Sequence, residues 1–299
     1  MSILLDSTSR VLVQGITGRE AALHVRYMLE YGTCVVAGVS PGKGGDEFAG
    51  IPVYDSVRSA LKEHAVDVSV LFVPSRFVRD AGLEAVEAGV PLVVILAEGV
   101  PHHDAAEILA RAREVGVRVL GPNSQGMISP GKAKVGGPGG DRPDLMFRPG
   151  PVGLISRSGG MGAEVSMALT KAGIGQSTYV AIGGDLLIGT EFTDLLPLFE
   201  ADPETRVVFL FGEPGTGREE AAARMIRRGG FGKPIVAFIA GEFLENLPRG
   251  LHFGHTGALI EGDLGRPSRK KAVLREAAVR VADHLDEIVP LVKEALASV

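Results

Sequence analysis

Residues 11–20, which read VLVQGITGRE, decide the fold of the first half of this chain. Residues 11–13 are branched and apolar, as in a short buried strand, and a helical pattern begins at Glu20. Gly15 and Gly18 between them permit a tight turn. Because such a turn places free backbone amides at the carboxyl end of a parallel strand, we expect an anionic ligand there.

The same alternation of strand and helix continues to residue 122. Expected strands cover residues 11–13, 34–39, 68–73, 92–96 and 117–120, and expected helices cover residues 20–31, 56–64, 77–88 and 104–115. Strands that alternate with helices are typical of βαβ units in a parallel sheet. With right-handed crossovers, residues 1–128 are therefore predicted to form a Rossmann-like domain.

Residues 129–150 break this alternation. Glycine and proline are frequent here, with GGPGG at residues 136–140, and the segment is predicted to be a linker that cannot continue a strand or helix. The pattern then resumes, with strands near residues 152, 178, 207, 235 and 279 and helices over 161–172, 190–200, 218–228, 268–277 and 284–297. Residues 151–299 are thus predicted to be a second doubly wound domain of the flavodoxin-like α/β type. Pro290 is expected to bend or break the last helix.

Composition excludes several classes of function. The chain has 299 residues, a net charge of −5 and a pI near 5.9, which gives no electrostatic footprint for nucleic acid or an anionic membrane. Cys34 is the single cysteine, so neither a disulfide nor a cysteine metal site is expected. No apolar run approaches the ~20 residues of a membrane span, and the N-terminus lacks a signal segment. A cytoplasmic protein is expected.

A second glycine-rich turn follows the strand near residue 152. Residues 156–160 read SRSGG and lead into a helix at Met161, so free amides and a positive dipole end are expected to face a phosphate. The acidic and basic run at residues 218–220 also opens a helix, and it is expected to form a solvated face.

Residues 252–258, HFGHTGA, place a histidine between two glycines. A neutral imidazole nitrogen can act as a nucleophile and form phosphohistidine, which suits His255. Glu213 follows the strand at residues 207–211, and its carboxylate could hold the imidazole in one tautomer. The alternatives are a packed or surface histidine and a solvated loop carboxylate. His252 is interpreted as the former.

These motifs resemble the alpha subunit of succinate–CoA ligase (succinyl-CoA synthetase), and the chain looks like a divergent member of that family nearly end to end. In that family the catalytic loop reads G-H-x-G-A, the phosphate turn S-R-S-G and the carboxylate loop G-E-x-G. The resemblance implies that His255 is phosphorylated and that Glu213 orients it. It also implies a phosphate site at Ser156, Ser158, Gly159 and Gly160.

The first glycine turn does not suit NAD. The G-x-G-x-x-G fingerprint is incomplete, and Lys43 stands where an acidic ligand of the ribose is usual, which disfavours a dehydrogenase. A lysine suits a phosphorylated ribose, although a solvated loop lysine is the alternative. The family resemblance assigns coenzyme A to Thr17, Gly18, Arg19, Glu20, Lys43, Leu96, Ala97 and Glu98.

The chain departs from the family pattern beside the phosphate turn. The family reads T-L-T-Y-E where residues 160–164 read GMGAE, so Ala163 replaces a tyrosine implied to touch substrate. The family's N-C-P-G turn is NSQG at residues 123–126, and its G-E-I-G-G is GEPGT at residues 212–216. A larger and less polar pocket, and an acid bulkier than succinate, are expected. The alternative is that another side chain or the partner subunit fills the space.

The sequence therefore predicts the alpha subunit of a nucleotide-dependent acid–CoA ligase that forms succinyl-CoA or a related acyl-CoA. Because no G-x-x-x-x-G-K-[ST] run is present, ATP or GTP with Mg²⁺ is expected on a partner subunit. The family resemblance implies that this partner is a beta subunit of the ATP-grasp type, in a hetero-oligomer. No histidine has metal-ligand spacing. Alternatives are the same mechanism on malate, citrate or another small carboxylic acid, and a non-catalytic CoA-binding regulatory protein.

Overall fold

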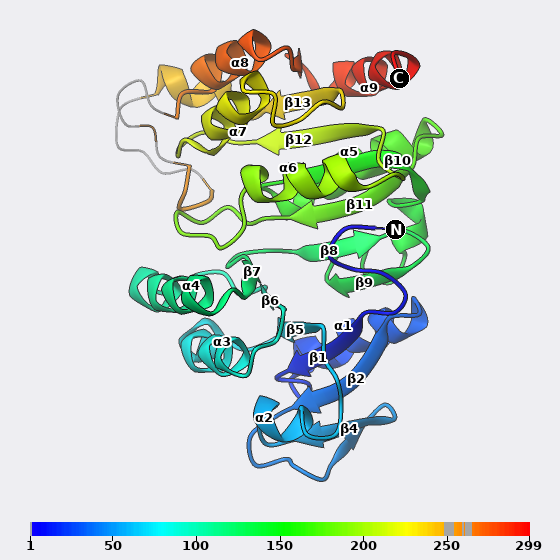
Figure 1. Ribbon diagram of the computed structural model, residues 1–299, viewed down its shortest axis with the longest axis vertical. Coiled ribbons are helices and arrows are strands. Elements are labelled where there is room, and N and C mark those ends of the chain that lie inside the picture. Colours follow the sequence, from blue (N-terminus) through cyan, green and yellow to red (C-terminus); the bar gives the residue numbers. More distant parts are fainter. Residues whose placement is uncertain (1, 248–253, 259, 261–264) are drawn as a thin grey trace.

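The computed structural model describes residues 2–247, 254–258, 260 and 265–299. His252 and Phe253 of the predicted histidine loop lie outside these residues. The described residues form two seven-stranded sheets, one above the other along the long axis of the molecule (Figure 1). Helices flank both sheets, which confirms the predicted α/β class.

The first sheet has the strand order β3-β4-β2-β1-β5-β6-β7. Strands β1, β2, β5, β6 and β7 are those predicted from the apolar runs, and the short strands β3 and β4 were not predicted. All pairs except β3 with β4 are parallel. The bounds are β1 Arg10–Gln14, β2 Cys34–Val39, β3 Glu47–Phe48, β4 Ile51–Tyr54, β5 Val68–Leu71, β6 Leu92–Ile95 and β7 Arg118–Leu120.

The second sheet has the order β14-β13-β12-β10-β11-β8-β9. Five of its strands are parallel, and β8 and β9 add an antiparallel hairpin beside β11. The bounds are β8 Gly126–Ser129, β9 Ala133–Gly136, β10 Pro149–Ser156, β11 Gln176–Ala181, β12 Val207–Gly212, β13 Ile235–Ile239 and β14 Arg280–Ala282.

The helices follow the predicted alternation with small shifts at their ends. In the first half they are α1 Arg19–Glu30, α2 Val57–Ala60, α3 Val78–Glu87 and α4 His102–Val115, with a 3₁₀ turn η1 at Ser75–Phe77. In the second half they are α5 Gly159–Lys171, α6 Phe192–Ala201, α7 Arg218–Arg227, α8 Pro267–Glu276 and α9 Ile288–Ala297, with 3₁₀ turns η2 Pro143–Leu145, η3 Glu242–Asn246 and η4 Leu285–Glu287. None of these helices combines the length and apolar composition that a membrane span requires.

The prediction that residues 129–150 form a linker without strands was wrong. Strand β9 and the ends of β8 and β10 lie within this segment, and Gly126 pairs with Gly136 across the hairpin. Both glycines have positive φ, of 100° and 85°, and a Cβ on Gly126 would lie 2.0 Å from the Val135 carbonyl oxygen. The glycines that suggested a chain break instead allow two strands to approach closely.

Pro290 does not break the last helix, contrary to the prediction. Helix α9 begins only at Ile288, after the 3₁₀ turn η4, so Pro290 is the third residue of the helix. Backbone amides in the first turn have no carbonyl partner within the helix, and a proline there removes no hydrogen bond.

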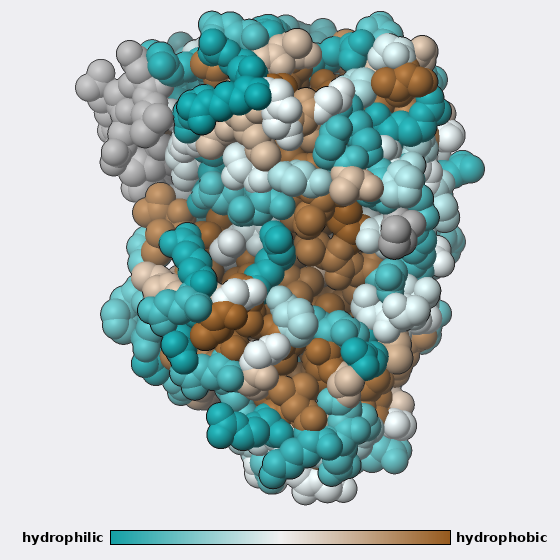
Figure 2. Space-filling view, viewed as in Figure 1, coloured by the Kyte–Doolittle hydropathy of each residue, from teal (hydrophilic) through white to brown (hydrophobic). Residues whose placement is uncertain are grey.

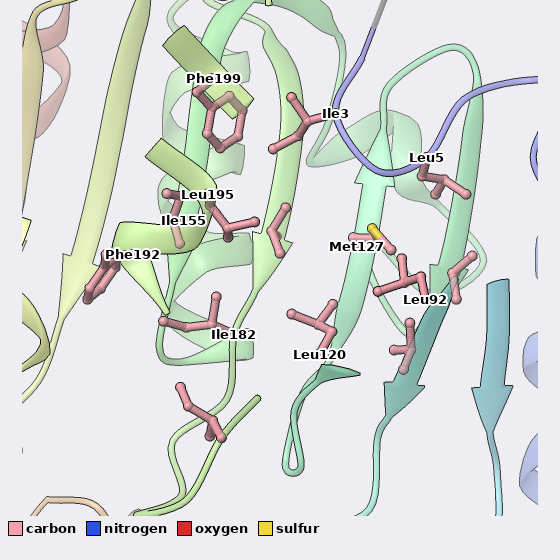
Figure 3. Packing of buried hydrophobic residues seen from close by; sticks show 14 of the residues in the cluster. Ile3, Leu5, Leu92, Leu120, Met127, Ile155, Ile182, Phe192, Leu195 and Phe199 are labelled. Atoms are coloured by element: carbon pink, nitrogen blue, oxygen red, sulfur yellow. The ribbon is translucent and has the colours of Figure 1, made fainter. Parts of the chain in front are cut away.

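One hydrophobic cluster contains residues from both sheets. A single cluster of buried residues runs from the N-terminal segment through β5 and β6 to β8, β10 and α6 (Figure 3). Ile3 and Met127 lie between Leu92 of β6 in the first sheet and Phe199 of α6, a helix that contacts the second sheet. In the space-filling view, apolar residues also gather near the centre of the face shown, around the junction of the sheets (Figure 2). The relative position of the two sheets is therefore set by packing.

Candidate functional site

The carboxyl ends of β10, β11 and β12 come together at one edge of the second sheet. β10 lies between β11 and β12 in the sheet. The chain therefore passes from β10 to β11 on one side of β10 and later to β12 on its other side. Ligands of doubly wound sheets bind at such a switch point, because the loops that follow the two neighbouring strands diverge. The turn after β10, the loops after β11 and β12, and the histidine loop all meet there.

His255 and Glu213 contact each other, as the sequence predicted for its catalytic pair. The Nδ1 atom of His255 lies 2.8 Å and 3.0 Å from the two carboxylate oxygens of Glu213. The side chain of Glu213 is 10% exposed and that of His255 is 26% exposed. An ionised carboxylate can only accept a hydrogen bond, so Nδ1 carries the proton and the Nε2 atom of a neutral ring keeps its lone pair.

The surroundings of His255 change its affinity for a proton. The hydrogen bond to Glu213 raises the pKa of His255, while burial and the charge of Arg157 lower it and Asp185 raises it slightly. The net direction is upward. The ring is thus more easily protonated than a free imidazole, and the neutral form is favoured only above its shifted pKa.

Gly184 allows the imidazole ring to lie against the loop after β11. A Cβ on Gly184 would stand 2.1 Å from both Cγ and Nδ1 of His255. The amide of Gly257 donates to the Gly184 carbonyl over 3.1 Å, and Thr256 donates to Asp185 over 3.3 Å. The histidine loop is therefore held on one side by the loop after β11 and on the other by Glu213.

Arg157 lies at the centre of this edge and is fully buried. Its guanidinium donates to the carbonyl oxygens of Glu213 at 2.9 Å, Pro214 at 3.1 Å and Gly257 at 3.5 Å. It also pairs with the carboxylate of Glu219 at 3.2 Å. One side chain from the turn after β10 thus binds the carboxylate loop and the histidine loop together.

The expectation that residues 218–220 form a solvated face was wrong. Arg218, Glu219 and Glu220 are all buried at the start of α7. Lys270, which is fully buried on α8, donates to the carboxylates of both Glu219 and Glu220. Burial pushes the pKa of Glu219 up, but Arg157 and Lys270 outweigh it and the pKa lies below its usual value. Charges at helical spacing are normally exposed, and only the tertiary partners make this burial possible.

The turn predicted to bind phosphate opens α5. Ser158 is the N-cap, and its hydroxyl accepts from the Met161 amide at 3.3 Å. Ser156 is buried and donates to the Ser158 carbonyl at 2.5 Å, so it supports the shape of the turn. Gly160 is exposed, and a Cβ on it would meet no atom within 4 Å. The first amides of a helix with its positive dipole end are therefore accessible at Gly160.

A tyrosine packs against the residues that precede Ala163 in the turn. Tyr179 from β11 is buried against the turn, and a Cβ on Gly162 would lie 2.5 Å from its ring. The phenol donates to the Gly159 carbonyl at 2.9 Å. A hollow of about 380 Å³ remains on the outer side of α5, and its lining includes Ala163 and the carboxylates of Asp141 and Glu164 but no cation. This lining does not by itself attract an anionic acid.

The first domain has a cleft of about 610 Å³ at the carboxyl edge of its sheet. It brings together six of the eight residues predicted to bind CoA, namely Gly18, Arg19, Glu20, Leu96, Ala97 and Glu98. Thr17 does not line this cleft, and its hydroxyl bonds with that of Ser40 at 2.9 Å. Lys43 does not line it either and lies in an exposed loop.

The cleft fits a ligand that carries phosphate. Helix α1 begins at Arg19, and its N-cap Gly18 provides no side-chain cap. The first amides of the helix are thus left to an anion, and Arg19 adds a positive charge. Gly15 makes the tight turn possible, since a Cβ on it would lie 2.5 Å from the Phe72 carbonyl oxygen. Within the described ranges, no three carboxylate, imidazole or thiol side chains are grouped to hold a metal ion.

Sequence reasoning gave no role to Arg157, Gly184, Asp185 or Asn123. Asn123 lines the cleft of the first domain and donates to Asp185 at 3.0 Å, while Asp185 accepts from Thr256 beside His255. In the sequence, the feature that could have pointed to these residues is the presence of polar residues soon after predicted buried strands. Their contacts cross from one loop to another, so spacing along the chain does not report them.

Residues 6–99 match the family described as "CoA binding domain", and residues 149–294 match "Succinyl-CoA ligase like flavodoxin domain". The chain is 46% identical, over 99% of its length and all of the relative's, to the ADP-forming succinate–CoA ligase subunit alpha 2 of Archaeoglobus fulgidus. It is 41% identical, with 99% of this chain and all of the relative covered, to the ADP-forming sulfoacetate-CoA ligase subunit SauD of Bilophila wadsworthia.

A solved structure has a similar fold. ATP citrate lyase from Methanothrix soehngenii, in complex with citrate and coenzyme A, superposes with a TM-score of 0.91 at 26% identity. The superposition covers 99% of this chain and 51% of that one, so this chain spans about half of the lyase. By both family matches and by its identity to relatives of the same length, the chain belongs to the family of succinate–CoA ligase alpha subunits.

Proposed function

We propose that this chain is the alpha subunit of an ADP-forming acid–CoA ligase and that His255 carries the phosphoryl group during the reaction. The names of its full-length relatives support the reaction class and the choice of ADP. The observation that carries the proposal is the contact of His255 with Glu213. It leaves Nε2 as the atom of a neutral ring that can attack phosphorus.

The proposed reaction has three transfers. The Nε2 lone pair attacks the γ-phosphorus of ATP, an N–P bond forms, and the bond to the bridging oxygen breaks with its electron pair leaving on ADP. A carboxylate oxygen of the acid then attacks the same phosphorus, and the N–P bond returns its electrons to Nε2. Finally the CoA sulfur attacks the acyl carbon and displaces inorganic phosphate, which takes the thiol proton.

Each group at the site has one task in this scheme. Glu213 keeps the proton on Nδ1 and stabilises positive charge on the ring as phosphohistidine forms. The open amides at Gly159 and Gly160 receive the oxygens of the transferred phosphoryl group. The dipole of α5 favours negative charge there.

Coenzyme A would occupy the cleft of the first domain and supply the thiol. Arg19 and the amides that open α1 would receive its phosphates, and Leu96, Ala97 and Glu98 would line its path. Thr17 and Lys43 lie outside this cleft and would reach the ligand only from its edge. Asn123 lies in the cleft and is hydrogen-bonded to Asp185, so this region of the cleft is close to the histidine loop.

The activated acid is a small carboxylate, with succinate as the first candidate because several relatives are named for it. Two relatives are named as sulfoacetate-CoA ligase subunits, which supports other anionic acids as further candidates. ATP and Mg²⁺ would be held by a beta subunit of the ATP-grasp type in a cytoplasmic hetero-oligomer. The names of the relatives as alpha subunits support a partner.

Labelling of the native complex tests this function. Incubation of the complex of both subunits with γ-labelled ATP should place acid-labile label on the wild-type chain, and succinate plus CoA should discharge it. His255→Asn should remain unlabelled, because an amide has no nucleophilic nitrogen. Equal labelling of this variant would exclude His255. A wild-type chain that binds CoA but takes no label would instead favour a non-catalytic regulatory protein.

A further inference from the structure

Arg157 is a buried cation whose contacts join three separate segments. It belongs to the turn after β10, between the two serines of the predicted phosphate site. Its Nη1 atom donates to the carbonyls of Glu213 and Pro214, and its Nη2 atom donates to the carbonyl of Gly257, two residues beyond His255. The guanidinium is fully buried, so these contacts are not exchanged for water.

The guanidinium also lies beside the carboxylate that orients His255. The Nε atom of Arg157 stands 3.9 Å from Oε2 of Glu213 and is buried without a hydrogen-bond partner of its own. Arg157 thus faces both the backbone and the charge of Glu213. A planar, rigid fork can hold two loops in one geometry, which a single ammonium group on a flexible stem cannot do.

We propose that Arg157 is a positioning residue of the phosphoryl transfer, which fixes the Glu213 carboxylate and the His255 loop against the phosphate turn. This inference rests on the proposed role of His255. Arg157 contacts the backbone of Glu213 and Gly257 and lies beside the Glu213 carboxylate. No contact with the phosphoryl group is assigned to it.

The competing role is purely structural. Arg157 shares Glu219 with Lys270, and Glu219 in turn accepts from the amide of Glu213 at 3.1 Å. Replacement of either cation would leave the negative charge of the buried Glu219 less well paired, and this would lower the free energy of unfolding. Lys270 is therefore a matched control, because it is fully buried and binds the same carboxylate but makes no contact with Glu213 or Gly257 in its hydrogen bonds.

The pH profile separates the two roles. Among the residues that the structure describes, the charged groups that act on the His255 ring are Glu213 after β12, Asp185 after β11 and Arg157 after β10. Arg157→Lys keeps the positive charge but removes the planar guanidinium group. The maximal labelling rate should therefore fall by about 10- to 100-fold, while the pH at which the rate is half-maximal stays unchanged. Arg157→Gln also removes the charge, so its midpoint should additionally move to higher pH.

The experiment measures single-turnover labelling by γ-labelled ATP across pH, in the native complex, with the melting temperature of each variant. We expect Lys270→Met to melt at a lower temperature than wild type while its labelling profile, recorded well below melting, stays within about twofold. Wild-type rates in Arg157→Lys, or failure of both Arg157 variants to assemble, would overturn the proposal and leave Arg157 a structural role. Absence of label on the wild type would instead refute the function of His255.

Discussion

The protonation state of His255 decides when its Nε2 atom can accept a phosphoryl group. The hydrogen bond to Glu213 raises the pKa of His255 above 6.5, against burial and Arg157. Below that pKa, Nε2 carries a proton and has no lone pair for phosphorus. Labelling should therefore increase with pH. By linkage, the protonated pair stabilises the fold below the unfolded pKa of about 6.5, and this contribution is lost as pH rises through the folded pKa.

Glu213→Gln should change both the rate and the pH dependence of labelling. The amide oxygen can still accept from Nδ1, but the negative charge is lost, so the pKa of His255 falls and the midpoint moves to lower pH. The maximal rate should fall by roughly 10- to 100-fold, as for other partners that orient a histidine. Glu63→Gln, an exposed glutamate hydrogen-bonded to Tyr54, is the control. A midpoint unchanged from wild type would contradict the assigned role of Glu213.

At the scale of elements, the amino ends of two helices are the proposed anion sites. Helix α1 opens the cleft of the first domain without a side-chain cap, and α5 opens beside His255 with Ser158 as its cap. Both helices follow a strand through a tight glycine turn. We therefore propose that the same local structure binds two different ligands, which the side chains around each helix end distinguish.

Calorimetry with CoA tests the first of these sites. Arg19→Ala should weaken binding by roughly tenfold, because a charge-assisted contact inside the cleft is lost. Lys43→Ala should have a smaller effect that added salt removes, since Lys43 lies in an exposed loop outside the cleft. NAD should not compete. Tight NAD binding without CoA binding would contradict the assignment, and a larger loss for Lys43→Ala would place the phosphate outside the cleft.

The opening of α5 also carries the prediction about the acid. Ala163→Tyr adds a phenol where the family has one, next to a turn already packed against Tyr179. If Ala163 enlarges the acid site, wild type should prefer an acid bulkier than succinate, and Ala163→Tyr should shift the preference toward succinate by about tenfold or more. The measurement is kcat/KM over mono-, di- and tricarboxylic acids. If succinate has the highest kcat/KM in both wild type and Ala163→Tyr, then the partner subunit or Tyr179, and not residue 163, determines which acid is preferred.

At the scale of the whole molecule, one hydrophobic cluster joins the two sheets. The buried cluster that contains Ile3 and Met127 extends from the first sheet to α6 on the second. Ser129 of β8 donates to the Leu5 carbonyl at 2.7 Å, and Thr33 donates to the Lys134 carbonyl at 2.8 Å. The hairpin of β8 and β9 thus binds the first domain while belonging to the second sheet.

Met127→Ala should therefore destabilise the entire chain. Removal of this fully buried side chain should cost about 2–5 kcal/mol, through lost burial and the cavity that remains. Calorimetry should show a single transition at lower temperature than wild type. Leu145→Ala, which alters a side chain at a position that is 53% exposed, is the control and should leave the transition in place. Two transitions, of which only one moves, would mean that the sheets unfold independently.

Much of the fold could be predicted because it depends on local pattern. Apolar runs and helical spacing located the parallel strands, and the expected strand over residues 34–39 matches β2 at both ends. Helix α2 is shorter than predicted, at Val57–Ala60. The β8–β9 hairpin was missed, because its glycines signal a chain break equally well. Whether such a segment pairs with a sheet edge depends on residues far away in the chain.

The candidate site likewise has features that could be predicted from the sequence and features that depend on distant contacts. The α/β class could be predicted from helix periodicity and glycine turns, which are local features of the sequence. The family and the pairing of His255 with Glu213 were predicted from loop motifs that resemble those of a known family. The contacts of Arg157 with these loops, the burial of residues 218–220 and the packing of Tyr179 against Gly162 became visible only in three dimensions. The reason is physical. A charge can be buried only where distant partners compensate it, and the sequence pattern shows a charge without showing its partner.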